Sequence, residues 1–144
     1  MKPEYNFTVH GIDLTPAEFE RLTAPLDAAK TPQERFTRAL ERATVAGYAF
    51  AESDDGGTCN LDSPALSINR EALKQMNMDR KTIEAAITDA GLTCWEQKSY
   101  FFSRRLVING AFFGQANRRE RMAKAFAKSL EEAGYPATMY RQMD

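Results

Sequence analysis

Residues 98–141 decide the fold class, and they read KSYFFSRRLVINGAFFGQANRRERMAKAFAKSLEEAGYPATMYR. Asn109-Gly110 lies between two apolar runs. This dipeptide is a strong hairpin signal, because a type I′ turn needs a positive φ at both central residues. We therefore predict an Asn-Gly hairpin with the pairs Ile108 with Ala111, Val107 with Phe112, and Leu106 with Phe113.

A long amphipathic helix follows this hairpin. Asn117, with Glu120 three residues later, is typical of a capping box, and Gly134 is placed to end the helix. One arc of the helix is apolar and comprises Met122, Ala123, Phe126, Ala127 and Leu130. The first turn carries three arginines, where the helix dipole disfavours cations. We interpret these arginines as serving an anionic partner, and the alternative is a solvated polar face with no ligand.

The remaining pattern mixes helices and strands. Helices are expected near 16–23, 32–46, 70–76 and 79–90, strands near 4–9, 48–51, 92–97 and 137–141, and a long loop over 53–64. Three Ala-Gly pairs, at Gly47, Gly91 and Gly134, are expected to mark helix exits. We predict a single α+β domain over residues 1–144. Its small mixed or antiparallel sheet has about five helices packed mainly on one face.

Positive charge is concentrated in the last third of the chain. Residues 97–144 hold nine Lys or Arg against four Asp or Glu, a net of +5, which leaves −6 for residues 1–96 because the whole chain carries −1. We expect a non-enzymatic protein that binds nucleic acid or another polyanion by phosphate neutralisation. The residues expected to bind are Arg104, Arg105, Arg118, Arg119, Arg121, Lys124 and Lys128.

Aromatic residues flank the same arginines. Tyr100, Phe101 and Phe102 precede Arg104, and Phe112 and Phe113 follow the turn. Such interleaving is typical of platforms on which unpaired bases stack. The alternative is that these rings form the hydrophobic core.

Two other functions stay open. A protein-interaction module, such as an inhibitor or adaptor of the kind carried by a mobile element, would act through an acidic surface of Glu52, Asp54, Asp55 and Asp62. A magnesium-dependent nuclease would use Glu96 and Lys98 on one strand face, with Asp54, Asp55 or Asp62 as the second acid. A Glu-x-Lys triplet is short and common by chance.

The composition narrows the remaining classes. One histidine and the separated Cys59 and Cys94 are too few for a structural zinc site, so we expect no metal and no cofactor. The opening residues lack a signal-peptide pattern, and no apolar run reaches transmembrane length. We therefore expect a small soluble protein of the cytoplasm with free thiols and no membrane partner.

Overall fold

The computed structural model describes residues 7–9, 12–49, 62–98, 104–110 and 116–141. Its helices are α1 (Pro16–Thr23), α2 (Pro32–Tyr48), α3 (Arg70–Met76), α4 (Arg80–Asp89), α5 (Ala116–Glu132) and a short 3-10 turn η1 (Leu26–Ala28). Its strands are β1 (Phe7–Val9), β2 (Ile12–Leu14), β3 (Ser63–Ser67), β4 (Thr93–Gln97), β5 (Arg105–Asn109) and β6 (Ala137–Tyr140). The predicted α+β class is confirmed.

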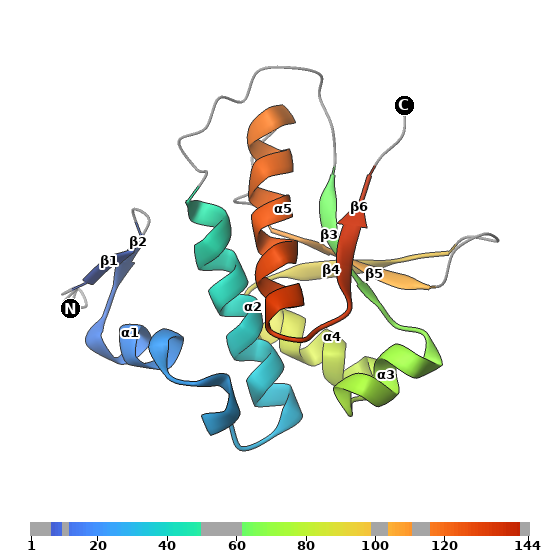
Figure 1. The fold of residues 1–144 in the computed structure, drawn as a ribbon, viewed down its shortest axis with the longest axis horizontal. Coiled ribbons are helices and arrows are strands. Elements are labelled where there is room, and N and C mark those ends of the chain that lie inside the picture. Colours follow the sequence, from blue (N-terminus) through green and yellow to red (C-terminus); the bar gives the residue numbers. More distant parts are fainter. Residues whose placement is uncertain (1–6, 10–11, 50–61, 99–103, 111–115, 142–144) are drawn as a thin grey trace.

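Four strands form one antiparallel sheet in the order β4-β5-β3-β6, and β1 pairs with β2 apart from it (Figure 1). The inner strand β3 was not predicted, because Ser63–Ser67 contains a proline and mostly small side chains. Proline is disfavoured inside a sheet because it cannot donate a ladder hydrogen bond. Pro64 pairs with Met139 of β6, and the pairing with β5 begins one residue later, at Ala65.

The hairpin predicted at Asn109-Gly110 is wrong. Leu106 and Val107 already have partners on both sides, in β3 and in β4. A central strand has no free edge, so the expected partners Phe112 and Phe113, which lie outside the described residues, cannot pair with them. Gly110 instead follows the end of β5, where its N–H donates to Asn109 Oδ1 at 3.0 Å.

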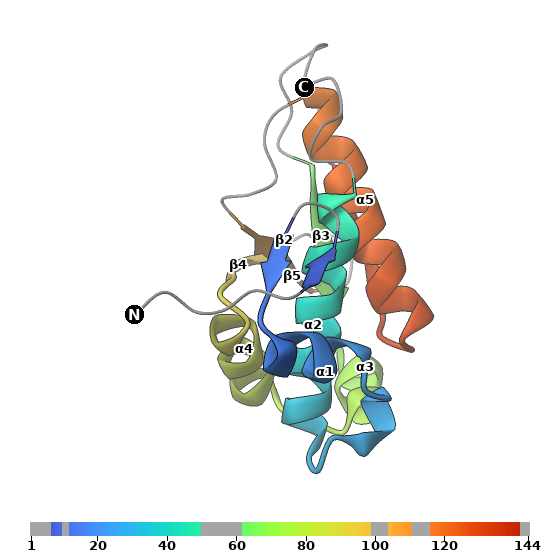
Figure 2. The ribbon, with the colours of Figure 1, turned by 90° about the vertical axis from the view of Figure 1, so that its left-hand side faces the viewer.

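Helices cover one face of the four-stranded sheet, as predicted. In Figure 1, α2 and α5 lie side by side in front of the strands, and Figure 2 shows the layers after a quarter turn. Alternate strand residues face these helices and enter the core: Leu66, Leu106, Ile108 and Ala137. They meet Phe36 and Leu40 of α2, Ile83 and Ile87 of α4, and Met122, Phe126 and Leu130 of α5. Burial of these apolar side chains is the main favourable term in folding.

Two of the three predicted helix exits are confirmed. Gly91 and Gly134 have φ values of +80° and +95°, and each ends its helix in a Schellman motif. The amide of Leu92 donates to the Ile87 carbonyl, and that of Tyr135 to the Leu130 carbonyl, both at 3.0 Å. Gly47 is different: α2 runs through it to Tyr48, so the strand expected from residue 48 is wrong where it is described.

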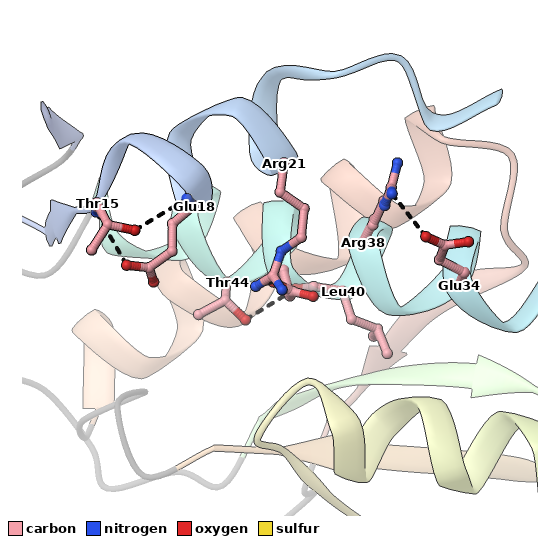
Figure 3. A network of polar contacts seen from close by, with 8 residues as sticks. Thr15, Glu18, Arg21, Glu34, Arg38, Leu40 and Thr44 are labelled. Carbon is pink, nitrogen blue, oxygen red and sulfur yellow. Dashed lines mark hydrogen bonds and ion pairs between the residues drawn. The ribbon is translucent and has the colours of Figure 1, made fainter. Parts of the chain in front are cut away.

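The N-terminus of α1 is capped by the side chain of Thr15. Thr15 accepts from the Glu18 amide at 3.2 Å and donates its own amide to the Glu18 carboxylate at 3.1 Å, which completes a capping box (Figure 3). These two bonds hold the pKa of Glu18 below its usual value. Asn117 does not cap α5 as predicted, because that helix already begins at Ala116.

Candidate nucleic-acid interface

Three predicted cations lie together on the outer face of α5. Met122, Phe126 and Leu130 are fully buried on its inner face, so Arg121, Lys124 and Lys128 point outward, and all three are exposed. We call these three residues the basic ridge. Arg121 and Lys124 make no hydrogen bond or ion pair with the described residues, and Lys128 lies 4.0 Å from Glu132.

An open groove runs along each side of the basic ridge. The groove of about 590 Å³ toward α2 has Ala46, Ala125 and Ser129 in its wall. The groove of about 740 Å³ toward β6 has Ala127, Thr138 and Met139 in its wall, together with Glu131 and Glu132. Lys124 and Lys128 border both grooves, so these ammonium groups stand between two shallow, largely apolar channels.

Arg119 does not belong to this surface, although the sequence suggested it. It is 9% exposed. Its Nε donates to the Asp62 carbonyl at 2.8 Å, and its Nη2 donates to Ser63 Oγ at 2.7 Å and to Asn109 Oδ1 at 3.1 Å. The guanidinium therefore joins α5 to β3 and β5, and it is not available to a polyanion. The side chain of Arg118 lies outside the described residues.

Arg105 lies on the sheet face opposite the helices, which we call the uncovered face because none of the described helices packs on it. Its guanidinium donates to Gln97 Oε1 of β4 at 2.6 and 2.9 Å. It also reaches across β3 to Thr138 Oγ1 at 3.1 Å and the Met139 carbonyl at 3.2 Å. All of these acceptors are uncharged, so the positive charge of Arg105 has no carboxylate partner among the described residues.

Arg104 joins a second group of cations around Glu96. The Glu96 carboxylate lies 3.1 Å from Arg80, 3.6 Å from Arg104 and 3.9 Å from Lys98, in ion-pair range of all three. The predicted Glu-x-Lys geometry on one strand face is therefore present, but Glu96 is surrounded by cations. Within the described residues, no group of three or more possible metal-ligating side chains occurs, while Asp54 and Asp55 lie outside them.

The predicted acidic surface is not supported at its one described member. Asp62 is 6% exposed, and its carboxylate accepts from Arg141 at 3.3 Å. Arg141 also reaches Glu120 at 3.4 Å. Asp62 is thus part of the packing between β3, β6 and α5 and not part of a docking surface. Glu52, Asp54 and Asp55 lie outside the described residues.

Sequence reasoning missed two aromatic residues on the uncovered face of the sheet. Trp95 is 46% exposed, and it is the one exposed large hydrophobic side chain in the described part of the chain. The Tyr140 ring meets it edge-on, with centroids 5.1 Å apart. The alternation of Trp95 with Cys94 and Glu96 could have placed it opposite the core. The aromatics expected to stack, at 100–102 and 112–113, lie outside the described residues.

No protein-family model, curated protein or solved structure matches this chain. Among the helices that the structure describes, none has both the length and the apolar character needed to cross a bilayer.

Proposed function

We propose that this protein binds nucleic acid, or a polyanion of similar charge density, through the basic ridge of α5. One observation carries the proposal: Arg121 and Lys124 are exposed on one helix face and make no ion pair with the described residues. Exposed cations that are not held in ion pairs can replace the counterions condensed on phosphates. Unlike the buried Arg119, they do not hold the fold together.

The spacing of the basic ridge suits a phosphate backbone. Arg121 and Lys128 are seven residues apart, which is about 10 Å along a helix axis. Phosphates on one strand of duplex DNA advance by about 3.4 Å each along the axis, so this length spans about three of them. Three side chains along this length can therefore contact successive phosphates.

Binding is favoured here over the other two functions. The burial of Asp62 and its bond to Arg141 remove one member of the acidic surface that an inhibitor or adaptor would use. The cations around Glu96 compete with a metal ion for its carboxylate. We therefore propose a non-enzymatic role. A cytoplasmic location fits Cys94, a free thiol whose pKa is raised by burial and by the nearby Glu84.

The test is fluorescence anisotropy with labelled single- and double-stranded DNA and RNA at two salt concentrations. Arg121→Glu with Lys124→Glu should weaken binding by more than about tenfold and lower the slope of log Kd against log salt by about two. The matched control is Lys74→Glu with Lys81→Glu. It makes the same charge change at exposed lysines of α3 and α4, away from the ridge (Figure 1). An equal loss of affinity in both double variants would contradict binding at the basic ridge.

A further inference from the structure

The uncovered face of the sheet carries no acidic residue among the described strand positions. Register places four residues in one row across it, Trp95, Val107, Ala65 and Thr138. Flanking positions on the same face are Thr93, Gln97, Arg105, Ser67 and Tyr140. Ser63 and Asn109, at the strand ends, instead accept hydrogen bonds from Arg119 of α5. Arg105 is the only charged residue in this set. Among these strand positions, an anion therefore meets one cation and no carboxylate.

Trp95 and Tyr140 form an aromatic bridge across this face. They belong to the two outer strands, β4 and β6, with β5 and β3 between them. Their centroids are only 5.1 Å apart at an interplanar angle of 84°, so both rings lean inward over the middle strands. Val107 and Ala65 are fully buried in the row between them. Trp95 itself stays 46% exposed.

The edge strand β6 connects this face to the basic ridge. Thr138 lies on the uncovered face, and with Met139 it also lines the groove beside Lys124 and Lys128. A chain bound along the ridge can pass over β6 and continue toward Tyr140 and Trp95. Only a single strand can both contact the ridge with its phosphates and stack a base on Trp95. In a duplex, the base faces are stacked on each other and closed to a protein ring.

We propose that the uncovered sheet face binds single-stranded nucleic acid, with an unpaired base stacked on Trp95 and a phosphate beside Arg105. This inference rests on the proposed function and names its substrate class. Aromatic rings on an antiparallel sheet provide stacking surfaces of this kind, and stacking is tolerant of base identity. Binding then depends on the exposed flat face of an unpaired base and not on the base sequence of the nucleic acid.

The test uses the fact that Trp95 is the only tryptophan in the chain. Its intrinsic emission therefore reports directly on this face. A 12-nucleotide dT oligomer and a 12-nucleotide RNA should quench the emission, whereas a 12-base-pair duplex and inorganic polyphosphate should bind the ridge without quenching. Quenching by polyphosphate equal to that by the oligomers would overturn base stacking.

Variants of Trp95 give a second measurement by anisotropy. Trp95→Ala should weaken single-strand binding by about 5- to 150-fold, Trp95→Phe should weaken it less, and duplex binding should be unchanged. Far-UV circular dichroism checks that each variant is folded. If Trp95→Ala leaves single-strand affinity unchanged, or weakens single strand and duplex equally, this inference is wrong. The proposed function then still stands if Arg121→Glu with Lys124→Glu weakens binding by more than about tenfold, and it fails as well if that variant binds normally.

Discussion

Arg119 and Arg42 both place guanidinium atoms inside the protein, with different outcomes. Arg119 donates to a backbone carbonyl, a hydroxyl and a side-chain amide oxygen. Nε and Nη2 of Arg42 are closed to solvent and donate no hydrogen bond to any residue that the structure describes. Arg42 lines a small cavity of about 140 Å³ with Leu14, Phe19 and Val45, between α1, β2 and α2. Burial, and then the neighbouring charge of Arg38, lowers the pKa of Arg42.

Replacing Arg42 should therefore stabilise the protein. Arg42→Met keeps an apolar stem of similar length and removes the donors that lack acceptors, so we expect the free energy of unfolding to rise by about 1–2 kcal/mol. Urea unfolding measures the change. The control is Arg38→Met, which removes a guanidinium bonded to Glu34 at 2.8 Å (Figure 3) and should give no gain. A loss of stability in Arg42→Met would show that Arg42 contributes favourably to the fold.

Helical periodicity alone places the arginines of α5 on different faces of the helix. At about 100° per residue, Arg119 lies on the side of Met122 and Phe126, while Arg121 lies on the opposite side. The burial of Arg119 was therefore predictable, although its acceptors were not. Asp62 and Ser63 lie more than fifty positions earlier in the chain, and no local pattern indicates that they meet Arg119.

At the scale of the element, the residue after each Ala-Gly pair differs between the two helices that end at the glycine and the one that continues through it. Leu92 and Tyr135 are 4% and 6% exposed, so each seals its Schellman motif with a buried side chain. Tyr48 comes after the third Ala-Gly pair and is only partly buried, and α2 continues through it. The same dipeptide thus ends a helix only where the next side chain enters the core, which the sequence alone does not reveal.

Gly134 offers a direct test of its backbone conformation. A Cβ at this position would meet nothing within 4 Å, so a substitution changes only the backbone preference. Gly134→Ala should lower the free energy of unfolding by about 1–2 kcal/mol, because φ is +95°. Gly134→Asn should cost less, since asparagine tolerates positive φ, as Asn77 does here at 54°. Urea unfolding of the two variants side by side is the measurement, and equal stability of Gly134→Ala and the parent would refute the argument.

The strands were harder to predict than the helices. Strand β5 was found from its apolar run, but its neighbours are β3 and β4, and the Asn-Gly turn signal pointed to the residues that come after it. Strand β3 has the sequence SPALS, whose small side chains suit a crowded inner position and give no periodic signal. Pairing partners are set by the packing of the whole sheet, which local propensity does not encode.

At the scale of the whole molecule, charge is uneven although the net value is −1. The surplus of +5 in residues 97–144 is partly neutralised or buried inside the fold, because Arg119 is buried and Arg141 pairs with Asp62 and Glu120. The basic ridge remains outside, together with a cation group around Glu96. A count of charges along the sequence therefore overstates the surface available to a polyanion.

Three ridge cations fix the expected salt dependence. If each neutralises one phosphate of duplex DNA, log Kd should rise with log salt at a slope of about 2.7. The affinity should then fall about 40-fold between 50 and 200 mM salt. Anisotropy titrations at four salt concentrations give the slope. A slope near six would mean that all seven predicted cations contribute, and a slope near zero would exclude phosphate neutralisation.

The position of β3 also governs when the sheet can assemble. Its residue Leu66 pairs with Leu106 and Ala137, which are 40 and 71 positions further along the chain. During synthesis on the ribosome, each edge of this inner strand must therefore stay open to neighbouring nascent chains until its partner, 40 or 71 positions further along, has been made. Pro64, which cannot donate to a foreign ladder, makes the waiting strand a poorer template for aggregation.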